Sequence, residues 1–228
     1  MKAMLLAAGR GERLRPLTDT LPKALVEVRG KPLALWHLER LAAAGYREVV
    51  INVSHLADGI MARLGDGSAC GLVIRYSRED VPLETAGGLA QARALLGEAP
   101  FLLVNADVFC DYDFARLRSR ALGAALAHLV LVPNPPHHAA GDFSLCEGRV
   151  GNGGAPRYTY AGIAVVSPAL VAGVAAGARA PLAPLLRAAA DRGRLSGELY
   201  EGLWTDVGTA ERLAELEAKV MADDAARG

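Results

Sequence analysis

"LAAGRGERLRPLTDTLPKALVEV", residues 6–28, follows a short apolar run at the start of the chain and combines glycines with basic side chains. Gly9 and Gly11 open the stretch, Arg13 follows them, and Lys23 comes later behind a proline. Glycine lets a backbone approach an anion closely, and arginine offers forked donors that match phosphate oxygens. The combination predicts a loop that binds a nucleoside triphosphate.

Two other kinds of loop fit the stretch less well. A dinucleotide loop, G-x-G-x-x-G, would need a third glycine where Leu14 stands, and an acidic residue at the end of the second strand, where the chain reads Val53, Ser54 and His55. The pattern G-x-x-x-x-G-K-[ST] of common ATPases is also missing. A surface loop with solvated charges would explain one arginine, but not the Pro-Lys segment that leads back into an apolar run.

Composition narrows the possible partners. The 228 residues include 25 Lys and Arg and 25 Asp and Glu, so no overall positive field favours nucleic acid or a membrane. Cys70, Cys110 and Cys146 are an odd number without C-x-x-C spacing, which favours reduced thiols. The first residues lack the apolar length of a signal peptide, and no long apolar span follows. We therefore expect a cytoplasmic protein with one domain, residues 1–228.

Short β-rich runs alternate with segments of helical period. Such alternation, with continuous apolar strands, predicts an α/β fold whose parallel sheet is covered by helices on both faces. Ligands of these sheets bind at the carboxyl ends of the strands. The predicted strands are residues 3–6, 48–53, 72–76, 101–104, 127–132 and 158–166, with helices at 32–44, 55–64 and 86–96.

The second half of the chain is less regular. Residues 133–157 are rich in proline and glycine, which predicts an inserted loop and hairpin region that forms a lid or wall. We expect helices at 168–177 and 181–192, an aromatic strand within 199–209, and an amphipathic helix from 210 to about 221.

Two aspartates end apolar or aromatic runs. Asp107 follows FLLVNA, and Asp206 stands in LWTDVGT before a helix. An aspartate at a strand end is often only a turn or capping residue. Beside a triphosphate loop, two such carboxylates instead suit Mg²⁺, which takes one or two carboxylates and completes its shell with phosphate or water oxygens.

The opening stretch is very similar to the signature of sugar-1-phosphate nucleotidylyltransferases, L-A-[AG]-G-x-G-x-R-[LM]-x-P-L-T followed by P-K-x-[LM]. The resemblance implies a three-layer α/β/α, Rossmann-like nucleotidyltransferase fold with a mostly parallel, mixed central sheet. It also implies Mg²⁺ bound by Asp107 and Asp206, and catalysis by Arg13, Lys23 and Asp107. The nucleotide would be bound by Leu6, Ala8, Gly9, Gly11, Glu12, Arg13, Lys23, Gly88 and Asn105.

Later segments resemble the same family with some departures. PLETAGG, residues 82–88, resembles the segment P-L-G-T-A-G that contacts the base, although Thr85 could simply cap a helix. Gly141, Ala161 and Gly162 resemble positions that line the sugar phosphate. The usual E-K-P segment is missing, and Ala106 stands where glycine is usual. The roles of Arg10, Arg15, His137 and His138 stay open, since adjacent histidines on a loop rarely share one metal.

Within the family, the chain most resembles members that use UTP and N-acetyl-α-muramate 1-phosphate. The resemblance implies formation of UDP-N-acetylmuramate and pyrophosphate in peptidoglycan recycling, by a monomer or a weak homodimer. One alternative is guanylyl transfer to mannose 1-phosphate, or nucleotidylyl transfer to another hexose 1-phosphate. A sugar-nucleotide-binding regulatory module is the alternative that is not an enzyme.

Overall fold

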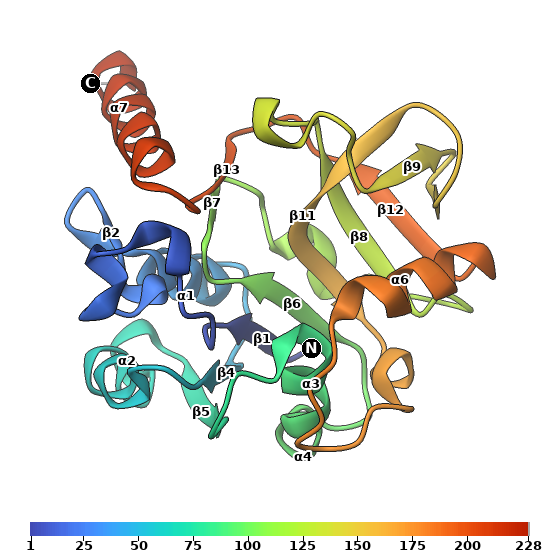
Figure 1. The fold of residues 1–228 in the computed structure, drawn as a ribbon, viewed down its shortest axis with the longest axis horizontal. Helices are drawn as coiled ribbons and strands as arrows, with labels where there is room; N and C mark the ends of the chain where they lie inside the picture. The colour runs from blue at the N-terminus through green and yellow to red at the C-terminus, as the bar shows by residue number, and fades with distance from the viewer. Residues whose placement is uncertain (228) are drawn as a thin grey trace.

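A nine-stranded sheet runs through the protein, with helices against both of its faces (Figure 1). The structure is a computed structural model that describes residues 1–227, with side chains up to Met221. Within these residues, β11 and β10 run opposite to the other strands of this sheet, so the sheet is mixed but mostly parallel. Across the sheet the strands are β5 (Val73–Arg78), β4 (Glu48–Val53), β1 (Ala3–Leu6), β6 (Phe101–Asn105), β11 (Arg157–Val166), β8 (Ala127–Val132), β12 (Leu195–Leu199), β10 (Arg149–Gly151) and β9 (Phe143–Cys146).

The two faces of the sheet bury two separate cores, because successive side chains of a strand point to opposite faces. Ala3 and Leu5 of β1 pack in the core that contains α1 (Leu33–Ala43), α2 (Ala57–Leu64) and α5 (Ala115–Arg118). Met4 packs in the core with α3 (Glu84–Gln91), α4 (Arg93–Leu96) and α6 (Leu182–Asp191). The predicted three-layer α/β/α architecture is confirmed.

Strands with continuous aliphatic runs lie where the sequence predicts them, and β1, β4 and β8 match residue for residue. The predicted helix at 168–177 is wrong beyond the short 3-10 helix Pro168–Val171. Gly173 lies two residues beyond its end and disfavours a helix, and Gly177 has a left-handed backbone (φ 79°) that no helix could include. The predicted helix at 86–96 is divided into α3 and α4 at Ala92.

The predicted strand within 199–209 is also wrong in extent. β12 ends at Leu199, and β13 (Trp204–Asp206) belongs to a separate two-stranded sheet with β7 (Val108–Cys110). The sequence pattern did not predict β12 because Gly197 stands where a strand would normally carry an apolar side chain. A Cβ at Gly197 would lie 2.9 Å from the Leu129 carbonyl oxygen, so this strand needs glycine to pack against its neighbours.

A third apolar cluster joins the beginning and the end of the chain. Leu14, Phe109, Leu216 and Val220 pack together, so the C-terminal helix α7 (Ala210–Arg227) lies against the region of the glycine loop. The Thr209 hydroxyl accepts the Arg212 N–H at 3.3 Å and caps α7. The helix continues past the predicted end near Met221.

Residues 133–157 contain a short 3-10 helix and a β-hairpin. The 3-10 helix η5 (Pro136–His138) precedes β9, which pairs with β10 in an antiparallel hairpin. Both hairpin strands join the large sheet, β9 through β11 and β10 through β12. No helix in residues 1–227 is long and apolar enough to cross a bilayer.

Candidate active site

The glycine loop leaves β1 at the carboxyl end of the sheet and turns sharply at Gly11. This residue has φ 66°, and a Cβ there would lie 2.9 Å from the Thr18 Cγ2 and 3.1 Å from the Lys23 Cβ. The Thr18 hydroxyl donates to the Gly11 carbonyl at 2.8 Å. The turn is therefore fixed against the segment that carries Lys23, and only glycine fits it without strain.

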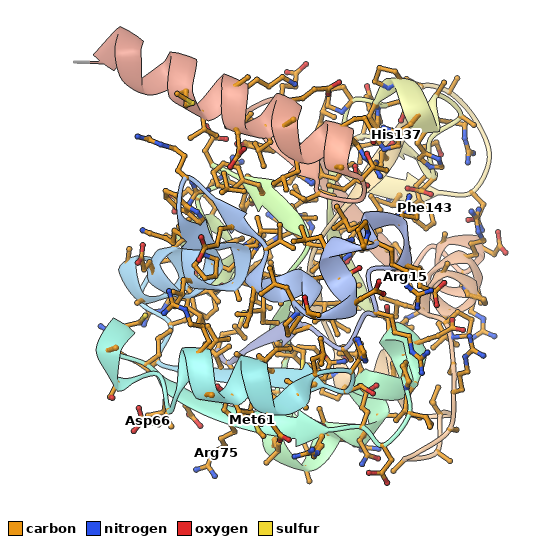
Figure 2. All side chains as sticks on the ribbon, turned by 60° about the vertical axis from the view of Figure 1, so that its left-hand side comes forward. Arg15, Met61, Asp66, Arg75, His137 and Phe143 are labelled. Atoms are coloured by element: carbon orange, nitrogen blue, oxygen red, sulfur yellow. The ribbon has the colours of Figure 1, made fainter. Side chains whose placement is uncertain are left out.

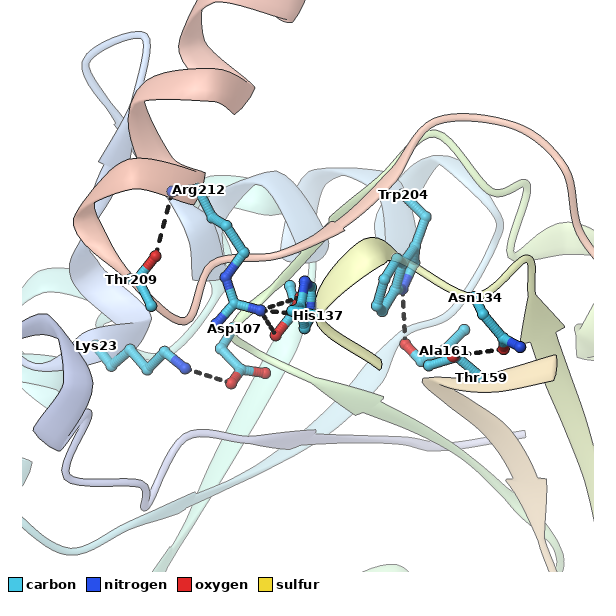
Figure 3. A network of polar contacts seen from close by, with 10 residues as sticks. Lys23, Asp107, Asn134, His137, Thr159, Ala161, Trp204, Thr209 and Arg212 are labelled. Atoms are coloured by element: carbon cyan, nitrogen blue, oxygen red, sulfur yellow. Dashed lines mark hydrogen bonds and ion pairs between the residues drawn. The ribbon is translucent and has the colours of Figure 1, made fainter. Parts of the chain in front are cut away.

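Lys23 and Asp107 form an ion pair at the carboxyl ends of two neighbouring strands. Lys23 begins the 3-10 helix Lys23–Leu25, and its Nζ donates to the Asp107 Oδ2 at 2.5 Å (Figure 3). Asp107 follows β6, which lies beside β1 with Asn105 opposite Leu6. The loop after one parallel strand thus meets the carboxylate after the next.

Asp206 lies next to Asp107 although it comes much later in the chain. Asp206 is opposite Val108 in the β13–β7 pair, and the Val207 N–H donates to the Asp107 carbonyl at 2.8 Å. The Arg212 Nη1 donates to both carboxylate oxygens of Asp206, at 2.8 and 2.7 Å (Figure 3). Both aspartates are therefore held on one platform, each by a basic side chain.

Three cavities meet at Asp107, which borders all of them. The first cavity (about 290 Å³) is lined by Leu6, Ala7, Ala8, Gly9, Lys23, Ala24, Asn52, Glu79, Pro82, Glu84, Thr85, Asn105, Ala106, Asp107 and Arg179. The second (about 830 Å³) is lined by Gly9, Arg10, Gly11, Glu12, Arg13, Lys23, Val81, Pro82, Asp107, Arg179 and Gly208. The third (about 340 Å³) is lined by Arg13, Asn105, Asp107, Val108, His137, His138, Thr159, Tyr160, Ala161, Gly162, Trp204 and Asp206.

Most of the residues that the sequence singles out border these cavities. Those from the opening stretch lie along the first and second cavities, Asn105 borders the first and third, and Ala161 and Gly162 border the third. Ala106, the departure from the family pattern, is buried and borders the first cavity. The structure therefore brings the N-terminal loop, both aspartates and part of β11 around one centre.

Gly88 and Gly141 are not among the lining residues. A Cβ at Gly88 would lie 2.7 Å from the Glu79 Oε1 and 2.9 Å from the Asn52 Nδ2, so this glycine lets α3 pack against a buried polar pair. Gly141 has φ 61° and lies against the Asn134 side chain, where a Cβ would be 2.7 Å from Oδ1. Both glycines have a reason in packing.

Sequence reasoning missed a buried polar pair in the wall of the first cavity. The Asn52 amide donates to the Glu79 Oε1 at 2.7 Å, and the Asn52 Oδ1 accepts the Ala7 N–H at 2.9 Å. The Glu79 Oε2 accepts the Leu83 N–H at 2.9 Å. The pair therefore ties β1, β4 and the start of α3 together, and the one available signal was an asparagine inside the apolar run VVINV.

Arg10 and Arg15 differ in position. Arg10 lines the second cavity, whereas Arg15 lies outside the three cavities and pairs with Asp19 at 3.1 Å between its Nε and the carboxylate. Figure 2 shows Arg15 on the outer part of the loop region, and its side chain is 58% exposed. Arg15 is thus a surface residue of the loop.

His137 and His138 have separate partners. The His137 Nε2 lies 3.1 Å from the Asp206 Oδ1 and 2.6 Å from the Arg212 Nη1, beside the first turn of α7 (Figure 2). The His138 Nε2 lies 3.0 Å from the Asp142 Oδ1. Within residues 1–227, no group of three or more His, Cys, Asp or Glu side chains could hold a metal ion.

His37, on α1, contacts the β13–β7 pair that carries Asp206. Its Nε2 lies 2.6 Å from the Val108 carbonyl oxygen, and because a carbonyl only accepts, this nitrogen carries the proton. Burial lowers the pKa of His37 from the ordinary 6.5 to about 4, so the ring is neutral at pH 7. A neutral histidine of α1 therefore holds the strand that follows Asp107.

The donor set at the platform fits Mg²⁺. Asp107 and Asp206 both border the third cavity, with side chains 34% and 24% exposed. Two accessible carboxylates that face a space large enough for phosphate match the preference of Mg²⁺ for a few carboxylates plus phosphate and water oxygens. The ion would supply positive charge between two anionic reactants.

Comparison with known proteins places this geometry in a family. Residues 2–146 match the family model described as nucleotidyl transferase. An N-acetylmuramate alpha-1-phosphate uridylyltransferase from Neisseria meningitidis serogroup B is 51% identical, covering 96% of this chain and 97% of its own length. A mannose-1-phosphate guanyltransferase from Aspergillus fumigatus is 44% identical over 51% of this chain and 33% of its own length.

The fold is also found among solved structures. A protein from Bacillus anthracis, described as a glucose-1-phosphate thymidylyltransferase, superposes with a TM-score of 0.84 at 21% identity. The superposition covers 96% of this chain and 94% of that one. At this identity, the similarity establishes the predicted nucleotidyltransferase fold.

Proposed function

The chain belongs to the nucleotidyl transferase family, and on that premise we propose that it transfers a uridylyl group from UTP to N-acetyl-α-muramate 1-phosphate. The products are UDP-N-acetylmuramate and pyrophosphate. One observation carries the proposal: Asp107 borders all three cavities and lies beside Asp206 on the β13–β7 platform. Two anionic substrates can therefore meet at a single pair of carboxylates.

The first and second cavities suit different parts of UTP. The first combines small apolar residues, among them Ala7, Ala8 and Ala106, with polar side chains, so it offers both an apolar wall and hydrogen-bonding groups to a nucleoside. The second contains the side chains of Arg10, Arg13 and Lys23 along the glycine loop, which suits the triphosphate. This division agrees with a base in the first cavity and phosphates in the second.

The reaction needs positioning and charge more than covalent help from the protein. A phosphate oxygen of the sugar phosphate attacks the α-phosphorus of UTP, and the bond to the pyrophosphate oxygen breaks. Arg13 and Lys23 bind phosphate oxygens and stabilise the negative charge that collects on the departing pyrophosphate. Asp107 and Asp206 would hold Mg²⁺, which when bound offsets phosphate charge at the same place.

The third cavity is the proposed site of the sugar phosphate. Ala161 and Gly162 of β11 form one wall, and the Trp204 indole N–H donates to the Ala161 carbonyl at 2.9 Å. His137 and His138 of η5 form another wall, ahead of the β9–β10 hairpin. Gly141 supports that wall from outside the cavity, through its contact with Asn134.

The cellular setting follows from the substrate. A sugar phosphate derived from N-acetylmuramate arises when peptidoglycan is recycled, so we place the enzyme in the cytoplasm, as a monomer or a weak homodimer. Neither nucleic acid nor a membrane is an expected partner, because the numbers of acidic and basic residues are equal.

A substrate panel tests the proposal. The enzyme is incubated with Mg²⁺, each of the four nucleoside triphosphates and several sugar 1-phosphates, and released pyrophosphate is measured. We expect the fastest release with UTP and N-acetylmuramate 1-phosphate. Silence with every pair would refute enzyme function and favour a regulatory module. A preference for GTP with mannose 1-phosphate would instead support the second candidate, which the 44% identity over half of the chain favours.

A further inference from the structure

Glu84 has an unusual backbone at the edge of the first cavity. It begins α3 with φ 59°, a left-handed conformation that L side chains rarely adopt. The pattern P-L-G-T-A-G that this segment resembles has glycine at this place, where the conformation is free of strain. A glutamate kept in such a conformation suggests that its side chain has a task.

The Glu84 carboxylate reaches across to Arg179, which comes from the segment before α6. The two side chains form an ion pair with 2.8 Å between the Glu84 Oε1 and the Arg179 Nη2. Both residues line the first cavity, and Arg179 also lines the second. The pair therefore borders the proposed base site where that site meets the phosphate site.

The backbone on the Arg179 side is fixed against α3. The Ala180 N–H donates to the Leu83 carbonyl at 2.9 Å, and the Ala180 carbonyl accepts the N–H groups of Ala86 and Gly87 at 3.0 and 3.1 Å. A Cβ at Gly87 would lie 2.3 Å from the Ala178 carbonyl oxygen, so the two segments touch backbone to backbone. The backbone at Arg179 can therefore not move away from α3 without breaking these contacts.

The strength of the ion pair itself is not what matters. Its side chains are 39% and 72% exposed, and exposed pairs stabilise a protein little. What the structure fixes is the backbone on both sides, left-handed at Glu84 and hydrogen-bonded next to Arg179, so both side chains start from fixed points at the rim of the first cavity. The first cavity, which this pair borders, has a volume of about 290 Å³.

We propose that Glu84 and Arg179 determine base specificity by limiting the first cavity to a pyrimidine. A purine is larger by a fused ring and has to displace the pair, whereas uracil fits beside it. This inference rests on the proposed function and deepens it, because it names the residues that select UTP over GTP. It also explains why a glutamate occupies a position that glycine would fill without strain.

Two variants test the inference with the whole enzyme. Glu84→Gly removes the carboxylate and relaxes the backbone, so folding is preserved, and Arg179→Ala removes the other partner. With N-acetylmuramate 1-phosphate as acceptor, we expect each to lower the ratio of kcat/KM for UTP over GTP by about tenfold, the scale of discrimination by pocket size. Calorimetric Kd values for UMP and GMP should converge in the same way.

Control variants separate bulk, charge and general surface effects. Glu84→Gln keeps the size and the strained backbone, so it should keep most of the UTP preference if size decides. Arg93→Ala removes an exposed arginine that pairs with Glu98 at 3.1 Å and lines none of the three cavities, so its ratio should equal that of the wild type.

Different results would refute the proposed function and the specificity role of Glu84 and Arg179. If the wild-type enzyme releases no pyrophosphate from UTP, the proposed function is wrong. If the wild-type enzyme prefers UTP while Glu84→Gly and Arg179→Ala both keep its UTP/GTP ratio within twofold and its UMP/GMP affinity ratio, the function stands and the specificity role is overturned.

Discussion

The two sides of the cleft differ in how they are built. On the nucleotide side, the first and second cavities are formed largely by the glycine loop and neighbouring strand ends, and most of their lining lies within residues 2–146, which match the family model. On the acceptor side, Thr159, Ala161, Gly162, Trp204 and Asp206 lie beyond that match. On the proposed function, the family model therefore covers most of the nucleotide side, whereas much of the acceptor side is built from segments beyond it.

The largest expected effect comes from the carboxylates at which the two sides meet. Asp107→Ala and Asp206→Ala should each lower kcat about a thousandfold or more, because each loses a carboxylate that would hold the Mg²⁺ ion, and with it the positive charge that offsets the reacting phosphates. Both side chains are partly exposed, so circular dichroism and thermal unfolding should remain close to the wild type. Asp58→Ala, which breaks an exposed pair with Arg78, is the matched control. Near-normal Mg²⁺-dependent turnover in either variant would contradict the metal assignment.

Lys23 distinguishes the nucleotide side from the acceptor side. Lys23→Ala should lower kcat/KM for UTP about a hundredfold, because a charged donor to the phosphates is lost. The KM for the sugar phosphate should change little, since Lys23 does not line the third cavity. Lys31→Ala, which removes a lysine paired with Glu39 at 2.6 Å, serves as the control. Equal increases of both KM values would mean that the two sides are not separate.

His37 contacts the β13–β7 pair that lies between the two sides, and its protonation should change the stability of the protein. The pKa of His37 is about 4 in the folded protein and 6.5 in the unfolded chain, so below pH 6.5 only the unfolded state gains the proton. The free energy of unfolding should therefore decrease as the pH is lowered, and the contribution of His37 to this decrease should be about 2 kcal/mol at pH 5.

The measurement is a urea titration of the wild type and of His37→Gln at pH 7 and pH 5. Burial also lowers the pKa of His128, so the variant should keep the part of the pH dependence that belongs to other groups. The difference between the two proteins isolates His37. If both proteins lose the same free energy of unfolding between pH 7 and pH 5, His37 is not the titrating group.

Gly162 gives the smallest expected effect and sharpens the boundary between the sides. It has φ 72°, and a Cβ there would lie 2.7 Å from the Asn105 Nδ2. Gly162→Ala should cost about 1–2 kcal/mol of stability. Asn105 borders both the first and the third cavity, so the KM values for UTP and for the sugar phosphate should both rise by a few fold.

The matched control is Gly173→Ala, where a Cβ would have no neighbour within 4 Å. Thermal unfolding and steady-state kinetics of both variants give the comparison. If Gly162→Ala changes only the KM for the sugar phosphate, displacement of Asn105 does not affect UTP binding, and the expectation is wrong.

The sequence predicted best where local pattern decides structure. Aliphatic runs correctly predicted β1, β4 and β8. The glycine loop and the two aspartates follow predicted strands, and because the carboxyl ends of parallel strands lie at one edge of a sheet, the sequence also predicted that they meet. Gly88 and Gly141 show the limit of this reasoning. Gly88 packs closely against Asn52 and Glu79, and Gly141 packs closely against Asn134. Such contacts depend on the tertiary arrangement.

The partners of charged groups were also beyond prediction. Arg212 reaches Asp206 because helix α7 is capped at Thr209 and packs on the third apolar cluster, and no sequence spacing reports that contact. Arg179 likewise joins Glu84 from the short segment between the two predicted helices 168–177 and 181–192, to which the sequence pattern gave no role. Long-range contacts of this kind need the packed structure.

The pairing of β13 with β7 has a consequence for how the enzyme is made. Asp206 is synthesised almost a hundred residues after Asp107, and the two become neighbours only when β13 joins β7. N-terminal segments fold first during translation, so a nascent chain can form the Lys23–Asp107 pair before its second carboxylate exists. The proposed metal site is therefore complete only when the C-terminal part has left the ribosome.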